Sequence, residues 1–261
     1  MKLSLVIPIY NEAEGVTRTA QQLSSTLTYL RNNHDVEVIL VDDGSQDATA
    51  ARLEAAFAHM PGITIISHER NRGIGAALRT GFAQASGDVI ITTDFDGTYP
   101  FYTIPQLVAR LTVDHADAVI ASPYHPHGSI RDAAGNTMRL GRAASLLYRI
   151  IVSPRIYSWT SLFAAYRREA LGKVTFESSG ALASTELLVN LVRGGFRVEE
   201  VPFNVQRRTF GRSRITTLRL IIEHVPYLLR LPVPLLVERI SSTMRALEPE
   251  PSTPAHPVKD N

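Results

Sequence analysis

The sequence predicts an α/β protein built on a mainly parallel sheet with helices on both faces. In the first half of the chain, short apolar β-branched runs alternate with helical patterns, which is typical of repeated strand–helix units. The runs are almost continuously apolar, as strands that are buried on both faces require. The length of 261 residues suits one sizeable domain with appended helices.

Strand and helix boundaries follow from these patterns. Strands are expected at residues 3–9, 36–41, 63–66, 89–93 and 118–121, and helices from the first strand to about residue 31, at 48–58 and at 75–85. Beyond Ser122, residues 123–136 mix Pro, His, Gly and Asp without periodicity and predict a mobile loop. Helices are then expected at 138–152 and 182–192, and strands at 161–166 and 196–202.

The C-terminal part is expected to separate from this domain after residue 214. Residues 215–246 contain two apolar helical stretches, interrupted by Pro226, Pro232 and Pro234, and predict amphipathic helices. The tail over 247–261 contains four prolines and is expected to be disordered. The predicted organisation is therefore one domain over 1–214, amphipathic helices over 215–246 and a disordered tail.

Composition excludes several kinds of site. The chain has no cysteine, so disulfides and thiolate metal ligands are excluded.

A net charge of +2 gives no reason to expect a nucleic-acid partner. The positive charge is concentrated, because residues 206–245 carry eight arginines and two acids. Such a segment suits the phosphates of a ligand or of a membrane surface.

Three predicted strands end in polar segments that bear carboxylates. These are residues 8–12 (Pro-Ile-Tyr-Asn-Glu), 41–45 (Val-Asp-Asp-Gly-Ser) and 94–96 (Asp-Phe-Asp). Open parallel sheets bind ligands beyond the carboxyl ends of their strands. Each segment alone is equally well explained as a polar loop in which Asn11 or Ser45 caps the next helix. Together they favour one crevice, because independent caps need not place three carboxylates beyond parallel strands.

Asp94 and Asp96 form the most informative pair. Two carboxylates around one residue in a turn can present oxygens to a hard cation such as Mg²⁺ or Mn²⁺, which fills its remaining positions with phosphates and water. The pair directly follows the apolar run 89–93. It therefore predicts a metal site that stabilises negative charge on a departing diphosphate.

Two further motifs each allow two interpretations. Residues 71–77 (Asn-Arg-Gly-Ile-Gly-Ala-Ala) form either a tight turn with close helix packing or a direct ligand contact. A nicotinamide or flavin site is rejected, since a third glycine is missing and the segment is outside the first strand–helix unit. Residues 207–214 carry four arginines and form either a solvated charge run or a diphosphate-binding loop. His125 and His127 lack a metal-ligand pattern and are assigned to a loop.

In this order, the segments resemble the family 2 glycosyltransferases with a GT-A fold. They are most similar to the polyprenyl-phosphate hexosyltransferases, a group that includes dolichol-phosphate mannose synthase. The resemblance runs from residue 3 to about residue 214 and includes residues 86–88 (Ser-Gly-Asp), 163–169 (Phe-Ala-Ala-Tyr-Arg-Arg-Glu) and 200–203 (Glu-Val-Pro-Phe). It implies a Rossmann-like sheet and inverting, metal-dependent transfer of a hexose from a GDP- or UDP-sugar to a polyprenyl or dolichyl phosphate.

The resemblance also implies roles for individual residues. Asp94 and Asp96 would hold Mg²⁺ or Mn²⁺, Arg208 and Arg214 would reach the diphosphate or the acceptor phosphate, and Glu186 would orient the sugar or nearby loops. The implied catalytic residues are Asp96, Arg208 and Arg214. The implied donor-binding residues are Pro8, Tyr10, Glu12, Val41, Asp43, Gly73, Asp94, Phe95, Asp96 and Arg208.

Three positions depart from the family pattern. Thr98 stands where the family often has Gln or His, Pro123 replaces an arginine expected near the acceptor phosphate, and Ser158 replaces an aspartate. The donor half is therefore intact, while the acceptor side differs. Two alternatives stay open: a glycosyltransferase with a non-lipid acceptor, and a non-catalytic partner that binds a nucleotide sugar.

The chain is expected in the cytoplasm, peripheral on the cytoplasmic face of the membrane. Its N-terminal apolar run is too short for a signal peptide, and no uncharged apolar stretch reaches the roughly 18 residues that span a bilayer. The helices over 215–246 would lie in the membrane interface, cover the domain core, or pair with another subunit of a homo-oligomer.

Overall fold

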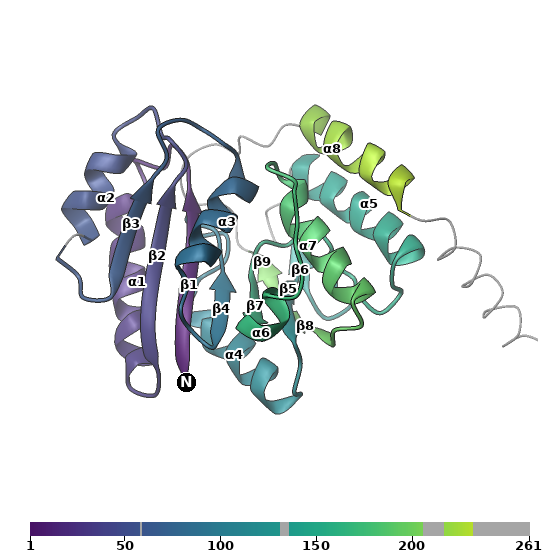
Figure 1. Ribbon diagram of the computed structural model, residues 1–261, viewed down its shortest axis with the longest axis horizontal. Helices are drawn as coiled ribbons and strands as arrows, with labels where there is room; N and C mark the ends of the chain where they lie inside the picture. The colour runs from purple at the N-terminus through teal and green to yellow at the C-terminus, as the bar shows by residue number, and fades with distance from the viewer. Residues whose placement is uncertain (58, 131–135, 206–216, 232–261) are drawn as a thin grey trace, which may run out of the picture.

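The computed structural model of the protein is built on a seven-stranded sheet with the order β3-β2-β1-β4-β7-β5-β8 (Figure 1). It describes residues 1–57, 59–130, 136–205 and 217–231. A two-stranded sheet pairs β6 with β9. The strands are β1 (Lys2–Ile9), β2 (Asp35–Asp42), β3 (Ile63–Ser67), β4 (Val89–Thr92), β5 (Ala118–Ser122), β6 (Ser129–Ile130), β7 (Ala164–Arg167), β8 (Val198–Pro202) and β9 (Asn204–Val205).

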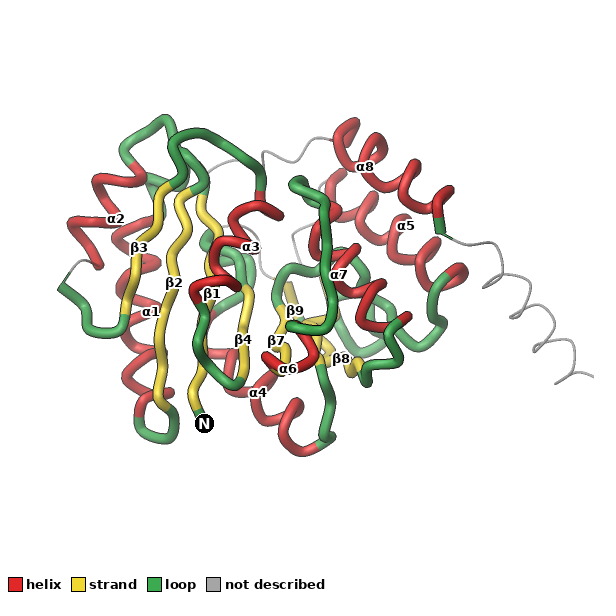
Figure 2. Tube along the Cα trace, viewed as in Figure 1, coloured by secondary structure: helices red, strands yellow, loops and turns green. Residues whose placement is uncertain are grey.

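Helices cover both faces of the large sheet (Figure 2). Apolar side chains of α1, α2 and α4 form the core on one face, and those of α3, α5 and α7 form the core on the other. The predicted α/β class with a mainly parallel sheet is confirmed. The helices are α1 (Val16–Arg31), α2 (Thr49–Phe57), α3 (Ile74–Gln84), η1 (Phe101–Thr103), α4 (Ile104–Val113), α5 (Asn136–Ile151), α6 (Arg168–Leu171), α7 (Leu182–Arg193) and α8 (Thr217–Arg230).

The strand order creates a topological switch point beside β1, which is called the switch below. The chain runs from β1 to β2 and β3 on one side and returns to β4 on the other, and these four strands are parallel. Ligands of open α/β sheets bind beyond the carboxyl ends of the strands at such a point. In the described sheet, β7 is the strand that runs antiparallel, between β4 and β5.

The central strand β1 is buried on both faces. Leu5 and Ile7 belong to the core under α1, whereas Val6 belongs to the core under α3. Full burial of such a side chain contributes about 1.5–3 kcal/mol. The helix α3 approaches β1 closely because Gly81 has no side chain; a Cβ there would lie 2.2 Å from Val6 Cγ1. A small residue on α3 therefore lets the helix cover the strand.

Most predicted boundaries lie within two residues of the observed ones, and the differences have physical causes. The sequence patterns do not predict α4, whose first turn holds Pro105, a position where the missing N–H needs no partner. The prediction that Pro226 interrupts a helix was wrong. It lies inside α8, where packing against α5 and α7 overrides the low helix propensity of proline.

Several predictions fall on residues that the structure does not describe. These are part of the predicted mobile loop (131–135), the basic segment (206–216), and the second apolar stretch with the proline-rich tail (232–261). In the rest of that loop, residues 129–130 form β6. None of the helices in the described ranges is long and apolar enough to cross a membrane.

Glu37 on β2 ties together the amino ends of β1 and β4. Its carboxylate accepts hydrogen bonds from Ser4 Oγ at 2.5 Å and from Ser86 N at 2.7 Å, and lies 3.1 Å from Lys2 Nζ. Burial by itself would raise the pKa of Glu37, but these partners lower it from 4.5 to about 2. The carboxylate is therefore a charged link between neighbouring strands.

Glu37→Gln is expected to lower the free energy of unfolding at pH 7 by about 1–3 kcal/mol, because hydrogen bonds to an ionised group are lost. A carboxyl group whose pKa is lower in the folded state stabilises the protein above pH 4.5, and this contribution is lost as the pH falls toward 2. Urea denaturation should show the gap between wild type and variant narrowing over that range. A gap independent of pH would contradict this role. Glu169→Gln, which breaks an exposed ion pair with Lys173, is the control.

Candidate functional site

The loops after β1 and β2 are joined by hydrogen bonds. Asn11, in a left-handed conformation (φ 54°), accepts a bond from Gln46 N at 2.7 Å, and its own N–H donates to Ser45 Oγ at 2.8 Å. The N-cap of α1 is Gly15, which makes no side-chain cap bond. Asn11 and Ser45 therefore connect two loops at the sheet edge, and neither caps α1.

Asp43 organises the turn that opens α3. The residue is 2% exposed, and its carboxylate accepts hydrogen bonds from Arg72 N at 2.9 Å and from Gly73 N at 2.7 Å. Asp43 Oδ1 also lies 2.7 Å from His68 Nδ1. The carboxyl ends of β2 and β3 and the start of α3 thus surround one buried carboxylate.

Gly73 and Gly75 pack against the segment between α6 and α7. Gly73 has φ 90°, and a Cβ there would lie 2.2 Å from Ser179 O. A Cβ at Gly75 would lie 2.1 Å from Ser178 O, and Gly75 N donates to Ser179 O at 2.8 Å. These distances favour the close-packing interpretation of the glycine motif, since no larger residue fits at either position.

Charged side chains hold the segment 176–182 in place. Arg79 of α3 donates to Ser178 O at 2.9 Å, and Glu186 of α7 accepts from Ser178 N at 2.9 Å. Glu223 of α8 accepts from Leu182 N at 3.1 Å. Glu186 therefore fixes the loop that packs on the glycine turn, and a contact between Glu186 and a sugar stays a prediction.

Asp94 and Asp96 lie where β4 leaves the sheet, beside the switch at β1. Asp96 Oδ1 accepts a hydrogen bond from Thr98 N at 2.8 Å, and Gly97 between them has φ 76°. Burial raises the pKa of the Tyr99 hydroxyl, and the negative charges of Asp94 and Asp96 add to that rise. Both aspartates lie in the segment that follows β4, on either side of Phe95.

Phe95, which lies between the two aspartates, anchors the loop in the core. Phe95 is 3% exposed in the core under α1, and its carbonyl accepts a hydrogen bond from Thr19 Oγ1 at 3.2 Å. Thr93 is fully buried, and its hydroxyl has no hydrogen-bond partner in the described part of the chain. The apolar anchor fixes the backbone that carries Asp94 and Asp96.

Ser158, one of the three positions that depart from the family pattern, joins the end of β5 to the middle of β8. Its Oγ lies 2.9 Å from Ser122 Oγ and accepts a hydrogen bond from Tyr124 N at 3.1 Å, and its N–H donates to Glu200 Oε1 at 2.8 Å. Burial raises the pKa of the Glu200 carboxyl, and the N–H groups of Tyr157 and Ser158 oppose the rise. A hydroxyl in place of the family's aspartate thus belongs to a buried polar network.

The described residues bring most of the predicted donor-binding segments to one edge of the sheet. Segments 8–12, 41–45, 71–75 and 94–98 lie at or beyond the carboxyl ends of the parallel strands β1 to β4. Val41 is fully buried, so its side chain packs in the core. Arg208 and Arg214 lie outside the described residues. The assigned roles of all these residues stay predictions.

The sequence patterns do not single out His68, and they include Glu200 only as part of the resembling segment 200–203, without a role. His68 directly follows β3, the kind of strand end that draws attention to Asp43, so the same rule would have found it. Glu200 lies inside β8 and has no strand-end signal. Its burial and its bonds to the segment before Ser158 come from the tertiary structure.

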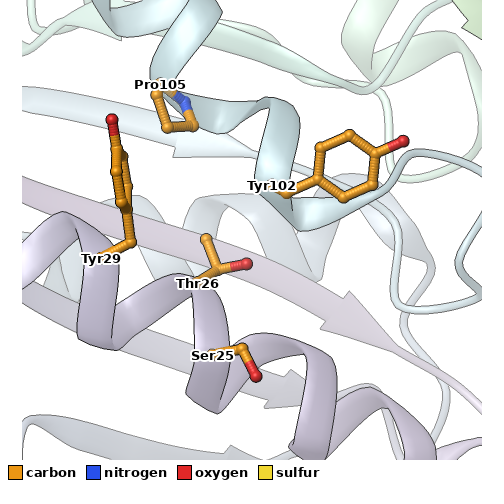
Figure 3. A pocket seen from close by; sticks show the side chains of 5 residues that line it. All are labelled: Ser25, Thr26, Tyr29, Tyr102 and Pro105. Atoms are coloured by element: carbon orange, nitrogen blue, oxygen red, sulfur yellow. The ribbon is translucent and has the colours of Figure 1, made fainter.

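A separate pocket of about 370 Å³ lies between α1 and the start of α4 (Figure 3). None of the described residues assigned to the candidate site lines this pocket, so it is distinct from that site. Its lining consists of Ser25, Thr26, Tyr29, Tyr102 and Pro105.

The sequence matches the profile of glycosyl transferase family 2 over residues 4–175, from β1 to the segment after α6. The chain belongs to glycosyl transferase family 2. The matched residues include the switch beside β1 and the loops that carry Asp43, Asp94 and Asp96. The resemblance found in the sequence is thereby confirmed at the level of the family.

Two relatives of this family 2 chain carry names that mention polyprenyl compounds. An undecaprenyl-phosphate 4-deoxy-4-formamido-L-arabinose transferase from Enterobacter sp. (strain 638) is 32% identical over 225 residues, which make up 84% of this chain and 64% of that protein. A polyprenol monophosphomannose synthase from Mycolicibacterium smegmatis is 29% identical over 222 residues, 81% of this chain and 80% of that protein. The chain thus spans less than two thirds of the first relative.

A solved structure shares the fold. Glucosyl-3-phosphoglycerate synthase from Mycobacterium tuberculosis, in complex with Mn²⁺, uridine diphosphate and phosphoglyceric acid, superimposes with a TM-score of 0.60 at 23% identity. The match covers 91% of this chain and 78% of that chain. Together with the family match, it confirms the predicted GT-A, Rossmann-like sheet.

Gly73→Ala is expected to destabilise the protein more than Gly195→Ala. Both glycines have positive φ, but nothing lies within 4 Å of a Cβ at Gly195, whereas one at Gly73 would meet Ser179 O at 2.2 Å. Gly195→Ala therefore measures backbone strain alone, roughly 1–2 kcal/mol. Gly73→Ala should cost at least about 1 kcal/mol more, because the loop must move and because Gly73, with ψ 156°, lies in a backbone region that only glycine readily adopts. Urea denaturation gives both values, and equal losses would contradict the close packing.

Proposed function

We propose that the protein transfers a hexose from a GDP- or UDP-sugar to a polyprenyl or dolichyl phosphate. The observation that carries the proposal is the position of Asp94 and Asp96, in a family 2 chain, at the carboxyl end of β4 beside the switch. The names of the relatives support a lipid-phosphate acceptor, since one names undecaprenyl phosphate and the other polyprenol monophosphomannose.

The residues at this edge fit a divalent metal ion. Asp94 and Asp96 offer carboxylate oxygens, the ligands that Mg²⁺ and Mn²⁺ prefer, and lie two residues apart just after β4. Among the described residues no third acid or histidine joins them, which suits a cation that takes its remaining ligands from a diphosphate and water. When bound, such an ion would stabilise the negative charge of the departing nucleoside diphosphate.

The acceptor chemistry needs no strong base. A phosphate monoester has a second pKa of about 6 and is largely ionised near neutral pH, so it is already a nucleophile. The side chains therefore have to hold donor and acceptor in line and stabilise the leaving group. The bond from the phosphate oxygen to the anomeric carbon forms as the bond to the nucleoside diphosphate breaks, which inverts that carbon.

Further donor contacts follow from the strand ends. We assign the nucleotide to the loops after β1, β2 and β3, and Arg208 and Arg214 to the diphosphate or the acceptor phosphate. Two points support the assignment of the arginines to a phosphate. A guanidinium group can donate two parallel hydrogen bonds to phosphate oxygens, and both arginines lie in the basic segment of the sequence. Residues 1–214 form the catalytic domain in this proposal.

Asp94→Asn and Asp96→Asn are each expected to lower kcat/KM by roughly 100- to 1,000-fold, because charge stabilisation in the transition state is lost. Transfer of labelled sugar from UDP- and GDP-sugars to undecaprenyl phosphate, with Mn²⁺ or with EDTA, measures this. Asp88→Asn is the matched control, since Asp88 precedes the same strand and accepts a bond from Lys2 N at 2.9 Å. Full activity of Asp96→Asn, or of the wild type in EDTA, would refute the metal-dependent reaction.

We further propose that α5 and α8 rest on the membrane surface that carries the acceptor. Six of the ten large apolar side chains that are strongly exposed in the described residues lie on these two neighbouring helices. Arg139 and Arg142 are exposed on α5 and suit anionic lipid headgroups. The six side chains are Leu146, Leu147, Ile150, Ile222, Val225 and Leu229.

The opposite side of α8 faces the protein. His224 is 4% exposed and contacts Tyr148 of α5, while Tyr227 and Leu228 pack on the core. The helix therefore covers the core with one side and presents Ile222, Val225 and Leu229 to the surroundings with the other. This amphipathic arrangement suits a helix lying in the plane of a membrane interface.

Leu229→Asp and Ile150→Asp are each expected to weaken binding to vesicles with anionic lipid by about tenfold, since each places a charge where an apolar side chain would enter the interface. Val113→Asp on α4 is the matched control, because Val113 is 73% exposed on the other face of the sheet. Co-sedimentation with vesicles measures the effect. Unchanged vesicle binding with a changed oligomeric state, seen by light scattering, would identify this face as a subunit contact instead.

A further inference from the structure

We infer that His68 is a positioning residue for the donor nucleotide, acting through Asp43. It holds the Asp43 carboxylate in one orientation, so that a fixed acceptor position faces the nucleoside. The inference rests on the proposed function, which assigns a nucleotide to this edge of the sheet.

The His68 ring bridges β2 and α3. It directly follows β3, and its side chain is 6% exposed. Nδ1 lies 2.7 Å from Asp43 Oδ1, and Nε2 lies 2.9 Å from Thr80 Oγ1 on α3. A carboxylate only accepts hydrogen bonds, so Nδ1 carries the proton of the bond to Asp43. Two bonds on opposite sides of a buried ring fix its orientation.

Among the described residues, the hydrogen bonds to Asp43 leave one acceptor position. Oδ1 accepts bonds from His68 Nδ1 and from Arg72 N, and Oδ2 accepts one from Gly73 N. A carboxylate has about four acceptor positions, so one remains, and it is on Oδ2. That position suits an N–H or O–H donor of a nucleoside, from the base or from the ribose.

Loss of the His68 ring would change this arrangement in a specific way. Oδ1 would lose a donor inside a site where the Asp43 side chain is 3% exposed, so the carboxylate would rotate or draw in water. Arg72 N and Gly73 N, which are bound to the same carboxylate, would follow. Nucleotide affinity should fall, while the reacting groups near Asp94 and Asp96 keep their places.

Calorimetric titration of the full chain with UDP and with GDP, in Mn²⁺, tests the inference. His68→Ala should weaken the Kd of the nucleotide that the wild type binds by about tenfold. His68→Asn should restore most of the affinity, since its amide nitrogen lies near the position of Nδ1, whereas the amide of His68→Gln lies near Nε2 and should not. The kcat at saturating donor should change by less than about threefold.

Two controls separate positioning from a general loss of structure. His115→Asn replaces an exposed histidine with φ 51° just before β5 begins, at the edge of the sheet opposite the carboxyl ends of the parallel strands, and should bind like the wild type. In an Asp43→Asn background, His68→Ala should add little, because a residue that acts through another loses its effect when that residue is changed. Thermal unfolding of each variant verifies that it is folded.

The outcomes distinguish this inference from the proposed function. A wild type that binds neither UDP nor GDP overturns both. If the wild type binds nucleotide, two results for a folded His68→Ala variant overturn the role of His68 alone. One is an affinity equal to that of the wild type, and the other is a lower kcat with an unchanged Kd. If His68→Ala is unfolded, the comparison of His68→Asn with His68→Gln decides, and equal affinities of these two overturn the role.

Discussion

The parallel register of β1 with β2 and β4 is the constraint on which the rest of the site depends. Ile9 pairs with Asp42, so β1 and β2 end at the same level, and Thr92 pairs with Val6, so β4 ends three residues earlier toward the same edge. In parallel strands that are buried on both faces, a polar side chain needs a partner within the protein, as Ser4 of β1 has in Glu37 of β2. The carboxylates of Asp43, Asp94 and Asp96 therefore follow the strands, and the register brings them together.

Carboxylates also fix the loops at this edge, because they accept bonds from backbone N–H groups that no strand or helix satisfies. Asp43 does this for the turn before α3, Glu186 for the segment that packs on that turn, and Glu223 for the start of α7. Gly73 and the segment 176–182 connect these three carboxylates through a continuous set of contacts. These contacts link the strand ends to α8.

Sequence patterns were sufficient for the sheet and for the strand-end acids, since both depend on local apolar periodicity and on polar residues directly after it. They were not sufficient where tertiary contacts decide. Pro226 stays helical because α8 packs on two other helices, and Glu200 is half-buried because the segment before Ser158 folds onto β8. The bonds of His68 to Asp43 and Thr80 join segments that the sequence separates, so no local pattern shows them.

The reversed direction of β7 has a consequence for how this protein can diversify. Ala164, its first residue, pairs with Thr92 and with Ile120, and Thr92 Oγ1 donates to Leu162 O at 2.5 Å. Because β7 runs antiparallel, the residues that precede it lie at the same edge as the residues that follow its neighbours β4 and β5. One half of the edge is encoded before residue 100 and the other after residue 120. Mutation can therefore remodel the second half and leave the first unchanged, and Pro123 and Ser158 both fall in that second half.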